Sequence, residues 1–244
     1  MNGKNFKILF LQHSRWVKPG EYGLWAERNG YSFSVIKLFE YEEIPTSVDA
    51  DMLVVLGGPQ NPASTKEEYG FFDVEKEKDL INLYASRGRI VLGSCLGAQI
   101  IGEAMGATYH HSPYQEVGHV RGNLTKEGRK DPFLADFPDS FDMGEWHNDM
   151  PGLTHNAEVL AYSDVCPHQI VRYGKYLYGF QTHMELNHEL VEGLVESSVD
   201  DTTVYEGPYI CSNEDVLSYD FSEMNRLLSS FLDKIAEDYL NNKK

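Results

Sequence analysis

The residue best suited to chemistry is Cys95, which stands in the run Gly93-Ser94-Cys95-Leu96-Gly97-Ala98-Gln99. A short apolar run, 90–92, precedes it, and a largely apolar segment, 100–105, follows. This order predicts a buried strand, a tight turn and a helix, with Cys95 on the turn. The small residues around it permit the strained backbone of a nucleophile elbow. The positive end of the helix dipole would favour the thiolate, which is the nucleophilic form of cysteine.

A cysteine nucleophile also needs a base and a group that orients the base. His183 and Glu185 are two residues apart and follow the apolar stretch 176–180, so in an extended chain they share a side. Glu185 could then hold the His183 ring while the ring faces Cys95. Taken alone, Cys95 would more often be a buried structural residue, but the flanking glycines and this His-x-Glu favour a catalytic role.

Composition limits the classes of function. A chain of 244 residues, 41% of them apolar, can form one large domain. The net charge of −17 argues against nucleic acid and anionic membranes as partners, and neither a membrane span nor a targeting peptide is evident. The three cysteines are far apart and predict no disulfide framework and no zinc spacing. We expect no metal, no cofactor, a cytoplasmic location and chemically inert Cys166 and Cys211.

The first half of the chain alternates apolar strands with helices. Strands are expected at 6–12, 32–38, 51–56 and 90–92, and helices at 22–29, 72–86 and 100–105. Such alternation predicts an α/β fold with a doubly wound, mostly parallel open sheet that carries helices on both faces. Sites in these sheets form beyond the carboxyl ends of the strands, which is where Gly57-Gly58 and Cys95 fall.

The second half predicts shorter strands and a helical end. Strands are expected at 116–124, 141–146, 159–163, 169–173 and 176–180, with a hairpin at Gly174-Lys175. A helix at 187–196, an acidic surface loop at 199–215 and an amphipathic helix at 221–240 are expected to follow. The apolar face of the last helix is expected to belong to the core rather than to a partner site. We expect a single domain over 1–244, with a C-terminal helical extension at about 197–244.

Five stretches resemble the class I glutamine amidotransferase family, and most closely its stand-alone members similar to the amidotransferase domain of GMP synthase. They are Leu56-Gly57-Gly58-Pro59, the run around Cys95, Glu116-Val117-Gly118, Trp146-His147-Asn148-Asp149 and Gly179-Phe180-Gln181-Thr182-His183-Met184-Glu185. The stretches come in the family's order and spacing over roughly 6–195. The resemblance implies a flavodoxin-like amidotransferase fold.

The resemblance also implies roles for single residues. Cys95 would attack the side-chain amide of glutamine and form a γ-glutamyl thioester, His183 would move protons, and Glu185 would orient His183. The backbone amides of Gly58 and Leu96 would form the oxyanion hole, a role suited to a glycine turn and a helix start. The substrate would be bound by Gly57, Gln99, Trp146, Asn148 and Asp149. His147 is expected to be structural or pocket-lining.

Four positions depart from the family's usual residues. Thr182 stands where the family commonly has Phe, Met184 where it has Pro, Asn148 where it has Gly, and His119 where it has Trp. None of these changes removes a catalytic atom. They bear on the shape of the pocket and therefore on the identity of the substrate.

Three functions are compatible with these residues. The first is a glutamine amidotransferase that releases ammonia to a separate synthetase or acceptor subunit, because no ATP-pyrophosphatase domain follows within the 244 residues. The second is a γ-glutamyl peptidase or hydrolase that acts on a free small molecule. The third is a catalytically silent binding or regulatory scaffold, against which the intact Cys-His-Glu set argues.

Overall fold

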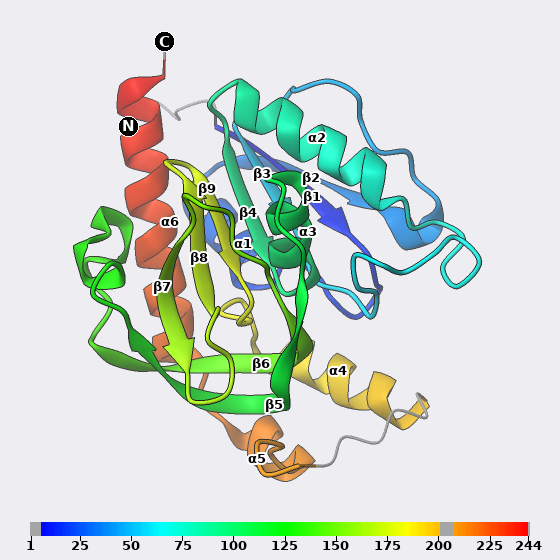
Figure 1. Ribbon diagram of the computed structural model, residues 1–244, viewed down its shortest axis with the longest axis vertical. Helices are drawn as coiled ribbons and strands as arrows, with labels where there is room; N and C mark the ends of the chain where they lie inside the picture. Colours follow the sequence, from blue (N-terminus) through cyan, green and yellow to red (C-terminus); the bar gives the residue numbers. More distant parts are fainter. Residues whose placement is uncertain (1–5, 201–206, 244) are drawn as a thin grey trace.

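A single mixed β-sheet forms the centre of the computed structural model, which describes residues 6–200 and 207–243 (Figure 1). Nine described strands follow the order β2-β1-β3-β4-β9-β8-β7-β5-β6. The parallel half contains β2 (Ser32–Lys37), β1 (Lys7–Gln12), β3 (Met52–Val55), β4 (Ile90–Ser94) and β9 (Leu177–Phe180). β3, β4 and β9 are fully buried, as expected for parallel strands covered on both faces.

Helices cover both faces of the parallel half. On one face, α1 (Glu21–Arg28) and α6 (Ser222–Asn242) contribute Trp25 and Phe231 to one apolar cluster. On the other face, α2 (Val74–Ser86) and α3 (Leu96–Ala104) contribute Leu80 and Ile100 to a second cluster. The two clusters lie on opposite sides of the sheet, so the predicted doubly wound α/β fold is confirmed (Figure 1).

The other half of the sheet is antiparallel. It contains β8 (Ile170–Gly174), β7 (Glu158–Ser163), β5 (His110–Leu124) and β6 (Ser140–Met150). The predicted hairpin between β8 and β9 is confirmed by the pairing of Gly174 with Leu177. β5 begins earlier than predicted, because His110 and His111 already pair with β6 before an irregularity in the register. Short 3-10 helices at Leu38–Glu40, Gly128–Lys130 and Pro132–Leu134 connect other elements.

The C-terminal segment is more helical than the sequence indicated. The prediction of a surface loop over 199–215 is wrong at both ends, because α4 (His188–Asp200) continues to Asp200 and α5 (Asn213–Ser218) begins at Asn213. The Ser212 side chain accepts a hydrogen bond from the Asp215 amide and caps α5. Residues 201–206 of the predicted loop lie outside the described residues.

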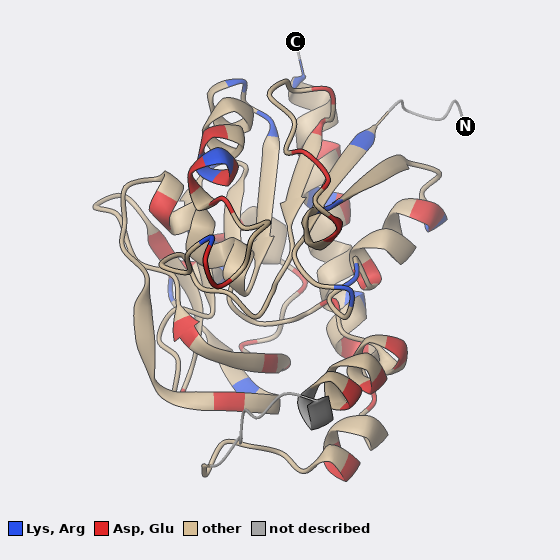
Figure 2. Ribbon diagram, turned by 90° about the vertical axis from the view of Figure 1, so that its right-hand side faces the viewer, with Lys and Arg blue, Asp and Glu red and all other residues tan. Residues whose placement is uncertain are grey.

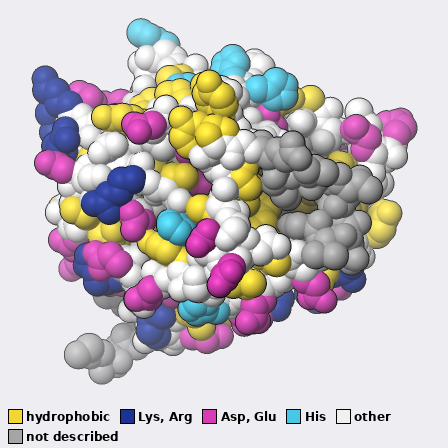
Figure 3. Space-filling model, turned by 90° about the horizontal axis from the view of Figure 1, so that it is seen from below, with side chains coloured by type: hydrophobic (Ala, Val, Ile, Leu, Met, Phe, Trp, Pro, Cys, Tyr) yellow, Lys and Arg dark blue, Asp and Glu magenta, His cyan; other side chains and the backbone are white. Residues whose placement is uncertain are grey.

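Asp and Glu residues are spread over helices, loops and strands (Figure 2). From below, acidic and hydrophobic side chains are mixed, and Lys and Arg side chains lie to the left and along the lower edge (Figure 3). No helix in the described part of the chain is long and apolar enough to cross a membrane.

Candidate active site

Cys95 occupies the sharp turn between β4 and α3. Its φ is 52°, a left-handed value that side chains disfavour, and Tyr41 is the only other non-glycine residue of the described chain with positive φ. Such strain persists only where the surroundings enforce it. Here the Cys95 amide donates a 2.7 Å hydrogen bond to the Phe180 carbonyl of β9. The structure thus places Cys95 on the sharp strand-to-helix turn that the sequence predicted.

Two glycines allow this turn to pack closely. A side chain at Gly97 would overlap the backbone carbonyl of Val55 on β3, and one at Gly93 would overlap the backbone of Gly97. The first turn of α3 can therefore lie directly against β3 and β4. This close approach fixes the position of Cys95 above the sheet.

The three predicted catalytic residues meet beyond the ends of the parallel strands. The Nδ1 atom of His183 lies 2.7 Å from Oε1 of Glu185, and the Cys95 side chain is near enough to the His183 ring to raise its pKa. Gly57 packs beside both residues, since a Cβ there would lie 3.4 Å from Cβ of Cys95 and 3.1 Å from Cε1 of His183. Cys95 remains 7% exposed, whereas His183 and Glu185 are 3% and 1% exposed. Cys95 is therefore the most exposed of the three residues.

The electrostatic surroundings of His183 favour its protonated form. Burial by itself would lower the pKa of the ring, but the Glu185 carboxylate and the Cys95 side chain outweigh burial and hold that pKa well above 6.5. The ring can therefore retain a proton taken from the Cys95 thiol.

Glu185 has a second set of partners that the sequence did not indicate. Ser94 donates a 3.4 Å hydrogen bond to Oε2 of Glu185, and the Tyr22 hydroxyl lies 3.0 Å from the Ser94 oxygen. Burial and the nearby Glu185 charge raise the pKa of Tyr22, so its hydroxyl stays protonated. The position of Ser94 beside Cys95 was a signal for its role, whereas nothing in the sequence pointed to Tyr22.

The segment that carries His183 and Glu185 is anchored from two directions. The His183 amide donates a 2.7 Å hydrogen bond to the Gly144 carbonyl of β6. From α6, the Asn225 side chain donates to the carbonyls of Met184 and Leu186, at 3.0 Å and 2.9 Å. These bonds hold the backbone on both sides of Glu185.

The predicted oxyanion-hole residues are neighbours. Leu96 is the first residue of α3 and is completely buried. Gly58 follows β3, and a Cβ at Gly58 would lie 3.2 Å from the Leu96 side chain. The structure thus brings both residues to the Cys95 turn, and their role in binding an oxyanion stays a prediction.

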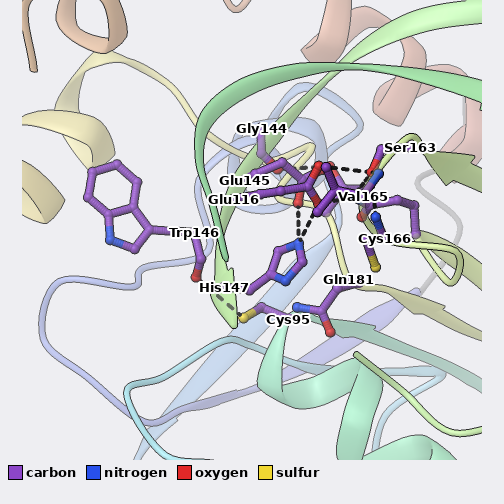
Figure 4. A network of polar contacts seen from close by, with 12 residues as sticks. Cys95, Glu116, Gly144, Glu145, Trp146, His147, Ser163, Val165, Cys166 and Gln181 are labelled. Carbon is purple, nitrogen blue, oxygen red and sulfur yellow. Dashed lines mark hydrogen bonds and ion pairs between the residues drawn. The ribbon is translucent and has the colours of Figure 1, made fainter. Parts of the chain in front are cut away.

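The residues predicted to bind the substrate fall into two groups. Gly57 and Gln99 lie close to the turn, and Gln99 donates a 3.1 Å hydrogen bond to the Gln181 side chain. The Trp146 carbonyl accepts a 4.0 Å hydrogen bond from the Cys95 sulfur (Figure 4). Farther along β6, Asn148 is exposed, and the Asp149 carboxylate lies 2.5 Å from the His111 ring.

The unusual residues occupy different surroundings. Thr182 is buried and donates a 2.9 Å hydrogen bond to the Gly144 carbonyl, and Met184 is completely buried. His119 stacks on Tyr219, with ring centroids 4.1 Å apart. Thr182 and Met184 therefore shape the interior beneath the His183 segment, whereas His119 contacts the C-terminal part of the chain.

A buried charged network lies beside Cys95, and sequence reasoning missed it (Figure 4). Residues 145 and 147 share one side of β6, and Nε2 of His147 lies 2.8 Å from Glu145 and 3.2 Å from Glu116. Burial would lower the pKa of His147, but the two carboxylates outweigh burial and raise it to about 10. Burial raises the pKa of Glu145. His147 therefore carries a positive charge within this network.

Three of the described residues in this region carry side chains that could coordinate a metal ion. Glu116, His147 and Cys166 each bring a ligand atom within 4.8 Å of the others. Both oxygens of Glu116 already accept hydrogen bonds, from Ser163 at 2.8 Å and Gln169 at 2.9 Å. Burial raises the pKa of the Cys166 thiol, which favours the protonated form. These contacts fit a protonated His147 better than a metal ion.

Comparison with known proteins identifies the family to which the chain is similar. Residues 26–194 match the family described as glutamine amidotransferase class-I. The glutamine amidotransferase-like protein YfeJ of Salmonella typhimurium is 43% identical over 232 residues, covering 94% of this chain and 97% of YfeJ. One subunit of the glutamine-hydrolysing GMP synthase of Methanococcus aeolicus is 27% identical over 60% of this chain and 70% of its own length.

Solved structures show the same fold over almost the whole chain. The crystal structure of SMU.1228c is 40% identical and covers 95% of this chain and 100% of its own, with a TM-score of 0.89. A glutamine amidotransferase from Thermotoga maritima is 21% identical and covers 96% of this chain and 99% of its own, with a TM-score of 0.82. The chain belongs to the class I glutamine amidotransferase family.

Proposed function

We propose that the protein hydrolyses a γ-glutamyl amide bond, with Cys95 as nucleophile, His183 as proton carrier and Glu185 as the group that orients His183. The observation that carries this proposal is the strained turn at Cys95, which lies beside a buried His183–Glu185 pair. Nucleophile, base and orienting acid form the arrangement that acyl transfer requires.

In the first half of the reaction, His183 accepts the thiol proton and the Cys95 sulfur attacks the γ-carbonyl carbon. The carbonyl oxygen becomes an oxyanion, which the backbone amides of Gly58 and Leu96 stabilise. Protonated His183 then gives its proton to the amide nitrogen. The carbon–nitrogen bond breaks, the amine leaves, and a γ-glutamyl thioester remains on Cys95.

In the second half, a water molecule attacks the thioester carbon while His183 accepts a proton from that water. The carbon–sulfur bond breaks, glutamate leaves, and the Cys95 sulfur recovers the proton. Glu185 stays ionised throughout and stabilises the positive charge that forms on His183. No cofactor takes part in these steps.

When glutamine is the substrate, the leaving amine is ammonia. We propose that a separate synthetase or acceptor subunit consumes this ammonia. The archaeal relative is one subunit of a glutamine-hydrolysing GMP synthase, which supports this arrangement. The second candidate is hydrolysis of a larger γ-glutamyl amide or peptide, which a pocket next to Gly58 favours.

Glutamate release from glutamine and a panel of γ-glutamyl peptides tests the proposal. The parent protein is expected to release glutamate from at least one compound, and Cys95→Ala is expected to release none. Cys211→Ala serves as the matched control, because Cys211 packs against Gly118 and His119. Equal release by Cys95→Ala and the parent would overturn the assignment, and no release by the parent would favour a silent scaffold.

A further inference from the structure

A pocket of about 800 Å³ opens beyond the carboxyl ends of β1 and β2. Volumes of this size accommodate small organic ligands. Pro59 and Gln60, which directly follow Gly58, form part of its wall, and the loop after β1 forms another part. None of these wall residues belongs to the predicted catalytic or glutamine-binding set.

The pocket adjoins the Cys95 site. A Cβ at Gly57 would lie 3.5 Å from the Val17 side chain as well as beside Cys95. The residues on either side of Val17, Trp16 and Lys18, line the pocket. The loop after β1 and the loop after β3 therefore border both the nucleophile and the pocket.

The strand order shows on which side of Cys95 the pocket lies. β4, which leads into Cys95, lies between β3 and β9, and the pocket lies on the side of β1 and β2 (Figure 1). Gln181, the partner of Gln99, follows β9, and Trp146 is on β6, so both belong to the other side of β4. A substrate whose glutamyl part contacts Gln99 and Trp146 would extend its amine part toward the pocket.

Aromatic rings form much of the lining. Trp16, Phe39, Tyr69 and Phe71 line the pocket and are half-buried. The Tyr69 and Phe71 rings lie 6.2 Å apart in an edge-to-face arrangement. Such surfaces favour a flat, apolar ligand group.

Basic side chains line the same pocket, although the net charge of the protein is −17. Lys18 and Lys37 contact Glu189 and Glu40, at 2.8 Å and 3.2 Å. Arg15 lies over the Trp16 ring at 4.7 Å, and among the residues whose side chains the structure describes, 6–197 and 207–243, no carboxylate forms an ion pair with it. Its guanidinium can therefore donate hydrogen bonds to an anionic ligand group.

Two residues of the pocket wall carry buried polar atoms without a partner in the described chain. Gln60 is 5% exposed, and within the described chain neither its amide nitrogen nor its amide oxygen has a partner. The Nδ1 atom of His13 likewise has no hydrogen-bond partner in the described chain, although its Nε2 atom lies 2.8 Å from Glu77. Both residues line the pocket. Buried polar groups are almost always paired, so these atoms are exceptions within the described chain, and the Gln60 amide oxygen faces Gly58, where a Cβ would lie 2.4 Å from it.

We propose that this pocket binds the amine part of γ-glutamyl substrates in which that part carries both a ring and a negatively charged group. The inference rests on the proposed hydrolysis of a γ-glutamyl amide and names the substrate class. The rings of the pocket would contact the ring of the substrate, and Arg15 would bind its anion.

Matched substrates test the two parts of this claim. γ-Glutamyl-phenylalanine has the ring and the carboxylate, γ-glutamyl-phenethylamine lacks the carboxylate, and γ-glutamyl-alanine lacks the ring. The kcat/KM for the first is expected to exceed each of the others by about tenfold or more. Arg15→Ala should remove the advantage over the phenethylamine compound, and Trp16→Ala should remove much of the advantage over the alanine compound.

Arg129→Ala is the control, because Arg129 is an exposed arginine paired with Asp139 outside the pocket, and it should leave all three values unchanged. Equal kcat/KM values for the three compounds, or a uniform loss in Arg15→Ala, would overturn the pocket assignment while leaving the hydrolytic function intact.

Calorimetric binding to Cys95→Ala separates failure of the pocket from failure of the chemistry. This variant should bind γ-glutamyl-phenylalanine about tenfold more tightly than the phenethylamine compound, and the added Arg15→Ala change should abolish the difference. If the parent cleaves nothing but this preference is present, the proposed hydrolysis fails and the pocket assignment is supported. Equal binding of the two compounds overturns the pocket assignment.

Discussion

At the scale of single residues, Glu185 is held on both of its oxygens. One contacts His183 at 2.7 Å, and the other accepts a hydrogen bond from Ser94. A carboxylate fixed in this way gives the His183 ring one orientation. The contribution of Glu185 to turnover should therefore come through His183.

Substitutions in the Cys-His-Glu set should differ in severity. Cys95→Ala should abolish turnover, because no other group can form the thioester. His183→Ala should lower kcat by about 10²–10⁴-fold, the usual contribution of a general acid–base, and Glu185→Ala should lower it less. Single-turnover glutamate release is the measurement, with circular dichroism to verify folding.

The double variant adds a stricter test of the same set. Residues that act as one unit are not additive, so Cys95→Ala/His183→Ala should be scarcely worse than Cys95→Ala alone. A double variant that loses much more activity than Cys95→Ala would show that some other nucleophile works with His183.

The three cysteines should react at very different rates with iodoacetamide at neutral pH. Cys95 lies at a helix start beside His183, whereas Cys166 is completely buried and its thiol has a raised pKa. Cys211 lacks an imidazole partner among its described contacts. Site-resolved mass spectrometry should find Cys95 modified first, and equal rates at all three in the folded protein would exclude an activated Cys95.

The buried charge on His147 gives a pH dependence. The folded protein retains on His147 a proton that an unfolded chain releases near pH 6.5. Its contribution to stability should be complete below about pH 6.5 and should be lost as the pH rises through about 10. Histidine NMR, with His147→Gln for assignment, should find a midpoint near 10, and a midpoint below 7 would refute a buried imidazolium.

At the scale of elements, α6 supports the segment that carries His183 and Glu185, the pair proposed to be catalytic. Met184 and Leu186 flank Glu185, and both of their carbonyls accept hydrogen bonds from Asn225. A helix distant in sequence thus positions the residues on which the proposed chemistry depends.

Loss of these two bonds should affect both stability and activity. Asn225→Ala should lower the free energy of unfolding by about 1–3 kcal/mol, because two hydrogen bonds are lost, and should lower kcat more than it changes KM. Denaturant unfolding and steady-state kinetics are the measurements. Asn242→Ala is the matched control, since Asn242 donates only to Asp238 within α6. Similar kcat losses in both variants would argue against a positioning role.

The sequence predicted the elements that depend on local signals. Apolar runs marked the parallel strands, and small residues around Cys95 marked the elbow, because both are encoded by neighbouring residues. The Tyr22–Ser94–Glu185 contacts and the Glu145–His147–Glu116 network depend on strands and helices that meet only in the fold. The start of α5 was missed because the acidic stretch around it has no clear apolar period.

At the scale of the whole molecule, the parallel half holds Cys95 and the antiparallel half brings Trp146 and His147 to it. α6 closes one face of the sheet with a row of buried side chains that includes Leu227, Phe231 and Ile235. The family relationship and the fold were accessible from sequence motifs, whereas the pocket beside Gly58 arises from three separate loops.

The single-domain prediction can be tested by removing α6. A chain ending at residue 221 should fail to fold cooperatively, because it would expose the apolar cluster that contains Trp25 and Phe180. A chain ending at residue 242 retains α6 and is the control. Cooperative thermal unfolding of both proteins would mean that the C-terminal helix is a dispensable addition rather than part of one domain.

The most direct test of the central claim is to trap the acyl-enzyme. Acid quenching during turnover, followed by peptide mass spectrometry, should find one glutamyl group attached through sulfur to the peptide that carries Cys95. The adduct should be absent from Cys95→Ala and should disappear from the parent as substrate is exhausted. Glutamate release with no adduct on Cys95 at any quench time, or an adduct that persists in Cys95→Ala, would contradict the proposed nucleophile.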